Sequence, residues 1–96
     1  MKKELKLTYL KKSKKFLDKH KNMLSESEID NLVIKFIKSR FYNIEQNIDY
    51  KALQGYNGNY YRIRKGNFRI IVQVVNDEII IEAIIEDIGF RGDIYK

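Results

Sequence analysis

Four of the five arginines lie in the last third of the chain, on or beside a run of predicted strands. They are Arg62, Arg64, Arg69 and Arg91. The first three fall on one face of a predicted hairpin, although like charges that face each other across two strands repel. Guanidinium groups that gather in this way usually bind an anion, and phosphate is the commonest one. The sequence therefore predicts an anion site, most simply a phosphate site, on this hairpin.

The rest of the composition limits which other chemistry is open to the chain. It has 96 residues, no cysteine and one histidine, which excludes a disulfide framework, a thiolate metal site and a His-rich metal site. His20 falls on a predicted helix at the margin of the core. We therefore expect neither a metal nor a cofactor.

The charge is unevenly distributed along the chain. The formal net charge is +6, and residues 1–24 carry nine lysines against Glu4 and Asp18. These lysines, Lys11 and Lys15 among them, indicate a solvated helix face that adds general attraction to polyanions. The arginines of the last third, in contrast, indicate an anion-binding site at a defined position in the fold.

Length and hydropathy set the expected organisation. A chain of this length predicts one domain, residues 1–96, without a linker or a repeat. The sequence contains neither an 18-residue apolar run nor the apolar segment of a signal peptide, so we expect no membrane span and a cytoplasmic location.

The first half of the chain predicts one strand and two helices. Residues 4–8 alternate between polar and apolar side chains, and from Tyr9 a basic amphipathic helix follows. Ser25 and Glu28 form a Ser-x-x-Glu capping box that begins a second helix, which fades after Arg40. A short connection predicts that the two helices pack as an antiparallel pair. The second helix has an apolar stripe at helical spacing: Ile29, Leu32, Val33, Phe36 and Ile37.

The second half predicts an antiparallel meander after a polar connection at 43–59. Its strands are 60–64, 68–75 and 78–86, and a two-residue turn at Gly66-Asn67 places Arg64 opposite Arg69. Strand alternation predicts one apolar face, with Tyr61, Ile63, Phe68, Ile70, Val72, Val74, Ile79, Ile81, Ala83 and Ile85. The other face carries Tyr60, Arg62, Arg64, Arg69, Ile71, Gln73, Glu82, Ile84 and Glu86.

These elements predict an α+β fold in the order β-α-α-β-β-β, with two antiparallel helices on one face of a small, mostly antiparallel sheet. This pattern resembles the RelE/ParE superfamily, the toxins of bacterial type II toxin–antitoxin pairs, and most closely its RelE-like branch. Three stretches carry the resemblance: Lys51–Gly55, Tyr61–Arg69 and Gly89–Tyr95. Together they cover the hairpin arginines and a terminal Arg-x-x-x-Tyr.

The resemblance implies a metal-independent endoribonuclease that enters the ribosomal A site and cuts mRNA, with the 2′-OH of the RNA attacking the adjacent phosphate. It implies a cognate antitoxin protein as partner in a hetero-oligomer. By motif position, the implied catalytic residues are Arg62, Arg64, Arg69, Arg91 and Tyr95. Lys65 beside the hairpin, with Lys11 and Lys15, is expected to contact RNA backbone.

The chain departs from the branch at the expected acid and base. Arginines stand at two strand positions where the branch has lysines, and arginine is a poor general base. Phe90 stands where many relatives have a histidine or a lysine. Glu82 or Glu86 could supply the base, or the arginines could only bind and strain the RNA. Two other functions remain open: a ParE-like inhibitor of DNA gyrase, and a non-catalytic basic module that binds an antitoxin or nucleic acid.

Overall fold

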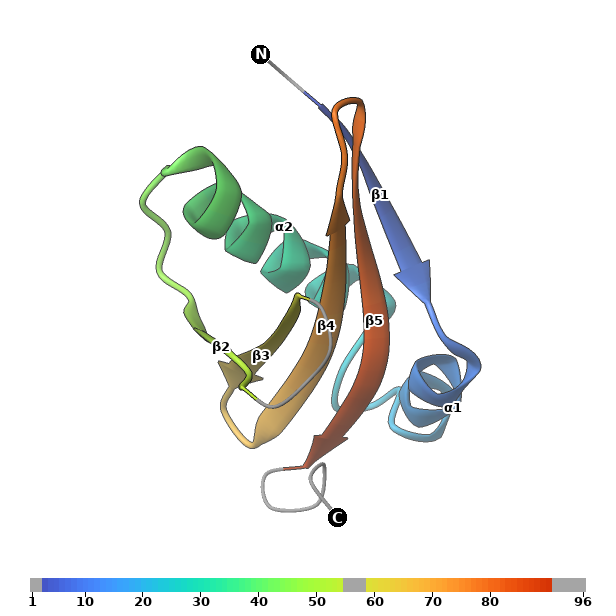
Figure 1. Ribbon diagram of the computed structural model, residues 1–96. Helices are drawn as coiled ribbons and strands as arrows, with labels where there is room; N and C mark the ends of the chain where they lie inside the picture. Colours follow the sequence, from blue (N-terminus) through green and yellow to red (C-terminus); the bar gives the residue numbers. More distant parts are fainter. Residues whose placement is uncertain (1–2, 55–58, 91–96) are drawn as a thin grey trace.

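The computed structural model describes residues 3–54 and 59–90, which form one five-stranded sheet with two helices (Figure 1). The strand order is β1-β5-β4-β3-β2, in which β1 runs parallel to β5 and the other neighbours are antiparallel. This confirms the predicted α+β class. The elements are β1 (Glu4–Tyr9), α1 (Lys11–Lys19), α2 (Glu26–Tyr42), β2 (Asp49–Ala52), β3 (Tyr60–Lys65), β4 (Phe68–Asn76) and β5 (Ile80–Phe90).

The second helix begins and ends where local chemistry requires. The Ser25 hydroxyl accepts a hydrogen bond from the Glu28 backbone N–H at 3.1 Å, and the Glu28 carboxylate accepts one from the Ser25 N–H at 3.1 Å. This confirms the capping box. At the other end, Asn43 adopts a left-handed conformation with φ of 54° and closes the helix.

One face of the sheet packs against the helices and forms the core. All five residues of the predicted stripe on α2 are buried, and they pack with inward-facing residues of β3, β4 and β5. Figure 1 shows α2 crossing one face of the sheet, while α1 lies at the side of β1 and β5. The buried strand residues are Tyr61, Ile63, Ile70, Val72, Val74, Ile81, Ala83, Ile85 and Ile88. Within the described residues, neither helix has the length and apolar character needed to span a membrane.

The first helix is shorter than predicted. Tyr9 belongs to β1, and the helix runs only from Lys11 to Lys19 before the chain turns at His20. Ser13 is fully buried, and its hydroxyl donates to the Ile85 carbonyl at 2.9 Å. This bond fixes α1 on β5.

Tyr9 joins the end of β1 to the start of α2. Its hydroxyl donates to the Asp30 carboxylate at 2.5 Å and lies 3.2 Å from the Glu26 carbonyl. Burial, followed by the hydrogen bond and charge of Asp30, raises the pKa of Tyr9 well above its usual value. The neutral hydroxyl is therefore the form that the folded protein prefers.

Replacing Tyr9 with Phe is expected to lower the free energy of unfolding by about 1–2 kcal/mol, since the donor to a carboxylate is lost. The raised pKa also predicts a pH effect. Unfolded tyrosine loses its proton near pH 10, so wild-type stability is full below that pH and falls above it. Urea unfolding at pH 7 and pH 10.5 measures both effects. A Phe variant as stable as the wild type at pH 7, with the same alkaline loss, would contradict this role.

A β-bulge changes the predicted faces at the end of β5. Ile71 of β4 pairs with Asp87, but the next residue, Val72, pairs with Ile85, so Glu86 is the extra residue. Asp87, and not Glu86 as predicted, therefore lies in the same cross-strand row as Ile71. The Ile85 carbonyl at the bulge accepts from Ser13 and from the Leu10 N–H at 3.1 Å.

The turn before β5 and the connection before β3 also differ from prediction. The turn extends to Ile79, which is 71% exposed, so its predicted place on the apolar face is wrong. Asp77 closes this turn because its carboxylate accepts the Ile80 and Ile79 N–H groups, which lower its pKa. The predicted polar connection at 43–59 contains the additional strand β2, which pairs with β3.

Candidate nucleic-acid interface

Three arginines lie together on the sheet face opposite the helices, as the sequence predicts. Arg64 of β3 pairs directly with Arg69 of β4, and the two-residue turn that sets this register has Gly66 at φ of 57°. Arg62 lies two residues before Arg64 and therefore projects from the same face. We call these three residues the arginine face.

Arg62 is the most deeply placed member of the arginine face. Its side chain is 11% exposed, whereas that of Arg64 is 36% exposed. Its cross-strand neighbour Ile71 is 7% exposed but lies outside the main core cluster. The Nε atom of Arg62 is buried and has no hydrogen-bond partner among the described residues. A charge in this setting is poorly screened by water, so it acts more strongly on a nearby anion.

A carboxylate that the sequence did not single out holds two of the arginines. Asp49 of β2 pairs in register with Arg64. One Asp49 oxygen accepts from Arg64 Nε at 2.9 Å, and the other lies 3.5 Å from a terminal nitrogen of Arg62. The signal for Asp49 was weak because it lies on a four-residue strand inside a stretch rich in Asn and Gln.

Of the two carboxylates predicted on the arginine side of the sheet, Glu82 lies on that side but away from the arginines, and Glu86 is the extra residue of the bulge. Glu82 accepts from the Thr8 hydroxyl at 2.7 Å and lies 4.0 Å from Lys6 Nζ, so it belongs to the β1 side. Its partner on β4 is Val75, four residues from Ile71, or about 13 Å along the strand. Because of the bulge, Ile71 pairs with Arg62 on one side and with Asp87, not Glu86, on the other. Asp87 in turn pairs with Lys12 at 3.0 Å.

The other predicted site residues lie elsewhere. Lys65 is exposed, but strand alternation assigns it to the helix side, where it lines a hollow with Glu28 and Lys35 of α2. Lys11 and Lys15 are exposed on α1. Arg91 and Tyr95 lie outside the described residues.

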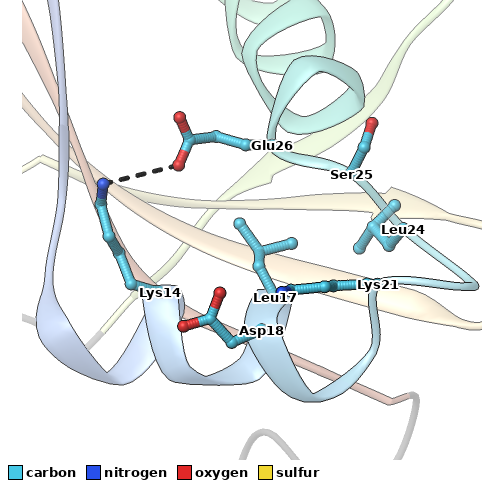
Figure 2. A pocket seen from close by; sticks show the side chains of 7 residues that line it. All are labelled: Lys14, Leu17, Asp18, Lys21, Leu24, Ser25 and Glu26. Carbon is cyan, nitrogen blue, oxygen red and sulfur yellow. Dashed lines mark ion pairs between the residues drawn. The ribbon is translucent and has the colours of Figure 1, made fainter.

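A hollow in the described part of the chain lies apart from the arginine face. It has a volume of about 480 Å³ and lies between α1 and the start of α2 (Figure 2). Lys14 pairs with Glu26 across it at 3.6 Å. Its lining mixes acidic, basic and apolar residues without a cluster of one kind: Lys14, Leu17, Asp18, Lys21, Leu24, Ser25 and Glu26. We therefore take the arginine face, and not this hollow, as the candidate site.

The arginine face has the chemistry to bind a phosphodiester. Guanidinium groups present paired N–H donors that match phosphate oxygens, and they keep their charge at every physiological pH. Fixed positive charge of this kind stabilises the negative charge that gathers on a phosphate during transesterification. No group of three or more His, Cys, Asp or Glu side chains suited to a metal occurs in the part of the chain that the structure describes.

Comparisons with known proteins identify two solved structures with a similar fold. No protein-family model matches the sequence, and no curated protein does so. The structure is similar to a chain of the RelB–RelE antitoxin–toxin complex from Methanococcus jannaschii, with 26% identity, a TM-score of 0.53, and coverage of 92% of this chain and 94% of that one. It is also similar to a chain of the archaeal RelE–RelB complex from Pyrococcus horikoshii OT3, with 22% identity, a TM-score of 0.54, and coverage of 97% and 99%. The chain therefore has a RelE-like fold.

Proposed function

We propose that this protein is the toxin of a type II toxin–antitoxin pair and that it cuts mRNA on the ribosome. The observation that carries the proposal is the arginine face, which gathers Arg62, Arg64 and Arg69 on the open side of a RelE-like sheet. Its work would take place in the cytoplasm, where translating ribosomes are found.

In the proposed reaction, the 2′-hydroxyl of the RNA loses its proton to solvent as its oxygen attacks the adjacent phosphorus, and the 5′-oxygen takes up a proton from solvent as its bond to phosphorus breaks. The products are a 2′,3′-cyclic phosphate and a free 5′-hydroxyl, and no metal is required. Arg69 and Arg91 stabilise the charge on the phosphate, and Arg62 and Arg64 orient the backbone. Tyr95 stacks on a base of the substrate. The exposed lysines Lys11, Lys15 and Lys65 add salt-dependent contacts to RNA backbone.

The proposed partner is an antitoxin protein that silences the toxin in a hetero-oligomer. Support comes from both similar structures, which are described as RelB–RelE complexes. A segment with acidic residues would neutralise the arginine face while it covers the sheet.

Brief expression of the chain in bacteria tests the proposal. Incorporation of labelled methionine is expected to fall within minutes, without DNA breaks or a DNA-damage response. Damage that precedes the loss of protein synthesis would indicate a gyrase inhibitor instead. Growth unaffected by expression of the folded chain would leave only a binding module.

A further inference from the structure

Asp49 contacts one nitrogen donor on each of two arginines that could bind a phosphate. Its carboxylate accepts from Arg64 Nε at 2.9 Å and lies 3.5 Å from the Arg62 nitrogen. A backbone phosphate bound at these two arginines would use the same N–H groups. In the free protein, the arginine pair therefore already holds an anion.

The contacts of Asp49 are suited to exchange. Its side chain is 48% exposed, and it lies on β2, a four-residue strand at the edge of the sheet. The ion pair with Arg64 is exposed on both sides and adds little to stability, and a phosphate that displaces Asp49 replaces its charge beside the more buried Arg62. Arg62, in contrast, is 11% exposed and held within the sheet. The Asp49 side chain can thus move away from the site while Arg62 stays in place.

We propose that Asp49 is an internal counter-anion of the arginine face, which keeps Arg62 and Arg64 paired in the free protein and gives way to an RNA phosphodiester. The inference rests on the proposed function for the identity of the ligand. It assigns Asp49 a regulatory role at the site: because a phosphate must displace its carboxylate, Asp49 lowers the affinity of the free protein for RNA.

Binding of a fully 2′-O-methylated RNA oligonucleotide tests this role, because the probe keeps the phosphates but lacks the attacking hydroxyl. Asp49→Asn is expected to bind it about three- to tenfold more tightly than wild type in 0.15 M salt, since a competing charge is removed. Glu82→Gln is the matched control. It makes the same charge change on the same sheet face, but beyond the screening length of about 8 Å, so less than a twofold change is expected.

The Nε–H signals of the arginines in an NMR spectrum report the exchange without any variant. In the wild type, the Arg64 signal is expected to shift when the oligonucleotide is added, and in Asp49→Asn it is expected to differ already in the free protein. Arg40, which stacks over Phe41 at 5.0 Å, is the internal reference and is expected to stay unchanged.

Two results would overturn the role of Asp49: affinity in Asp49→Asn no greater than in Glu82→Gln, or an Arg64 signal that does not respond to the probe. Weaker binding by Asp49→Asn, with a melting temperature equal to that of the wild type, would also overturn it, since Asp49 would then only orient the arginines. These readouts do not involve cleavage. If RNA displaces Asp49 but cells show no mRNA cleavage, the proposed nuclease function is wrong and the role of Asp49 stands. If cells show cleavage but RNA does not displace Asp49, the role of Asp49 is wrong and the nuclease function stands.

Discussion

Replacing Arg69 with Ala is expected to slow mRNA cleavage by about 10²–10³-fold, the usual loss when one fixed donor to a developing oxyanion is removed. Arg69 lies directly opposite Arg64 on the neighbouring strand, so its guanidinium belongs to the same local field as the other two arginines. The charge that develops on the attacked phosphate would lose one of its stabilising partners. Single-turnover cleavage on ribosomes programmed with a defined mRNA measures the effect.

Arg40→Ala is the matched control for Arg69→Ala. It removes the same side chain, but Arg40 lies at the end of α2 and packs over the rings of Phe41 and Tyr61. Its cleavage rate is expected to stay within threefold of the wild type, provided that both variants unfold at similar urea concentrations. Equal losses in the two variants would show that the arginine face has no special part in the reaction.

Replacing Phe36 with Ala is expected to lower the free energy of unfolding by about 3–5 kcal/mol, a large share of the total for a small domain. Phe36 is fully buried and its ring centroid lies 5.0 Å from that of Tyr50 on β2 and 4.9 Å from that of Tyr61 on β3. The cavity would remove the contact that joins α2 to both strands. Because Asp49 precedes Tyr50, β2 and its carboxylate would lose their anchor as well.

Urea unfolding followed by circular dichroism measures the loss in Phe36→Ala. Ile79→Ala is the control, because Ile79 is 71% exposed in the turn before β5 and its truncation is expected to change stability by no more than about 0.5 kcal/mol. A loss below about 1 kcal/mol in Phe36→Ala would contradict its place at the centre of the core.

The parts of the fold that could be predicted are those where local chemistry and periodicity agree. The Ser25–Glu28 capping box and the apolar stripe of α2 determine where that helix begins and which face it buries. The turn at Gly66 sets the hairpin register, and with it the pairing of Arg64 with Arg69. These features involve residues close in sequence, so their spacing alone is informative.

The features that could not be predicted depend on contacts between distant residues. β2 has only four residues, and just one of them, Tyr50, packs on the core cluster, so it carries no alternating pattern. Asp49 becomes a site residue only through its pairing with β3. Likewise, the bulge that places Asp87 opposite Ile71 lies beside Ile85, whose carbonyl accepts from Ser13 of α1, a residue 72 positions away in sequence. Strand alternation cannot reveal an extra residue of this kind.

The most direct test of the central claim is primer extension on mRNA from cells that briefly express the chain, beside an Arg69→Ala/Arg91→Ala variant. The account predicts new 5′ ends within translated codons in cells with the wild type, and their absence in cells with the variant. Growth arrest without such ends would contradict ribosome-dependent cleavage. Ends of equal abundance in both strains would contradict the assignment of the reaction to these arginines.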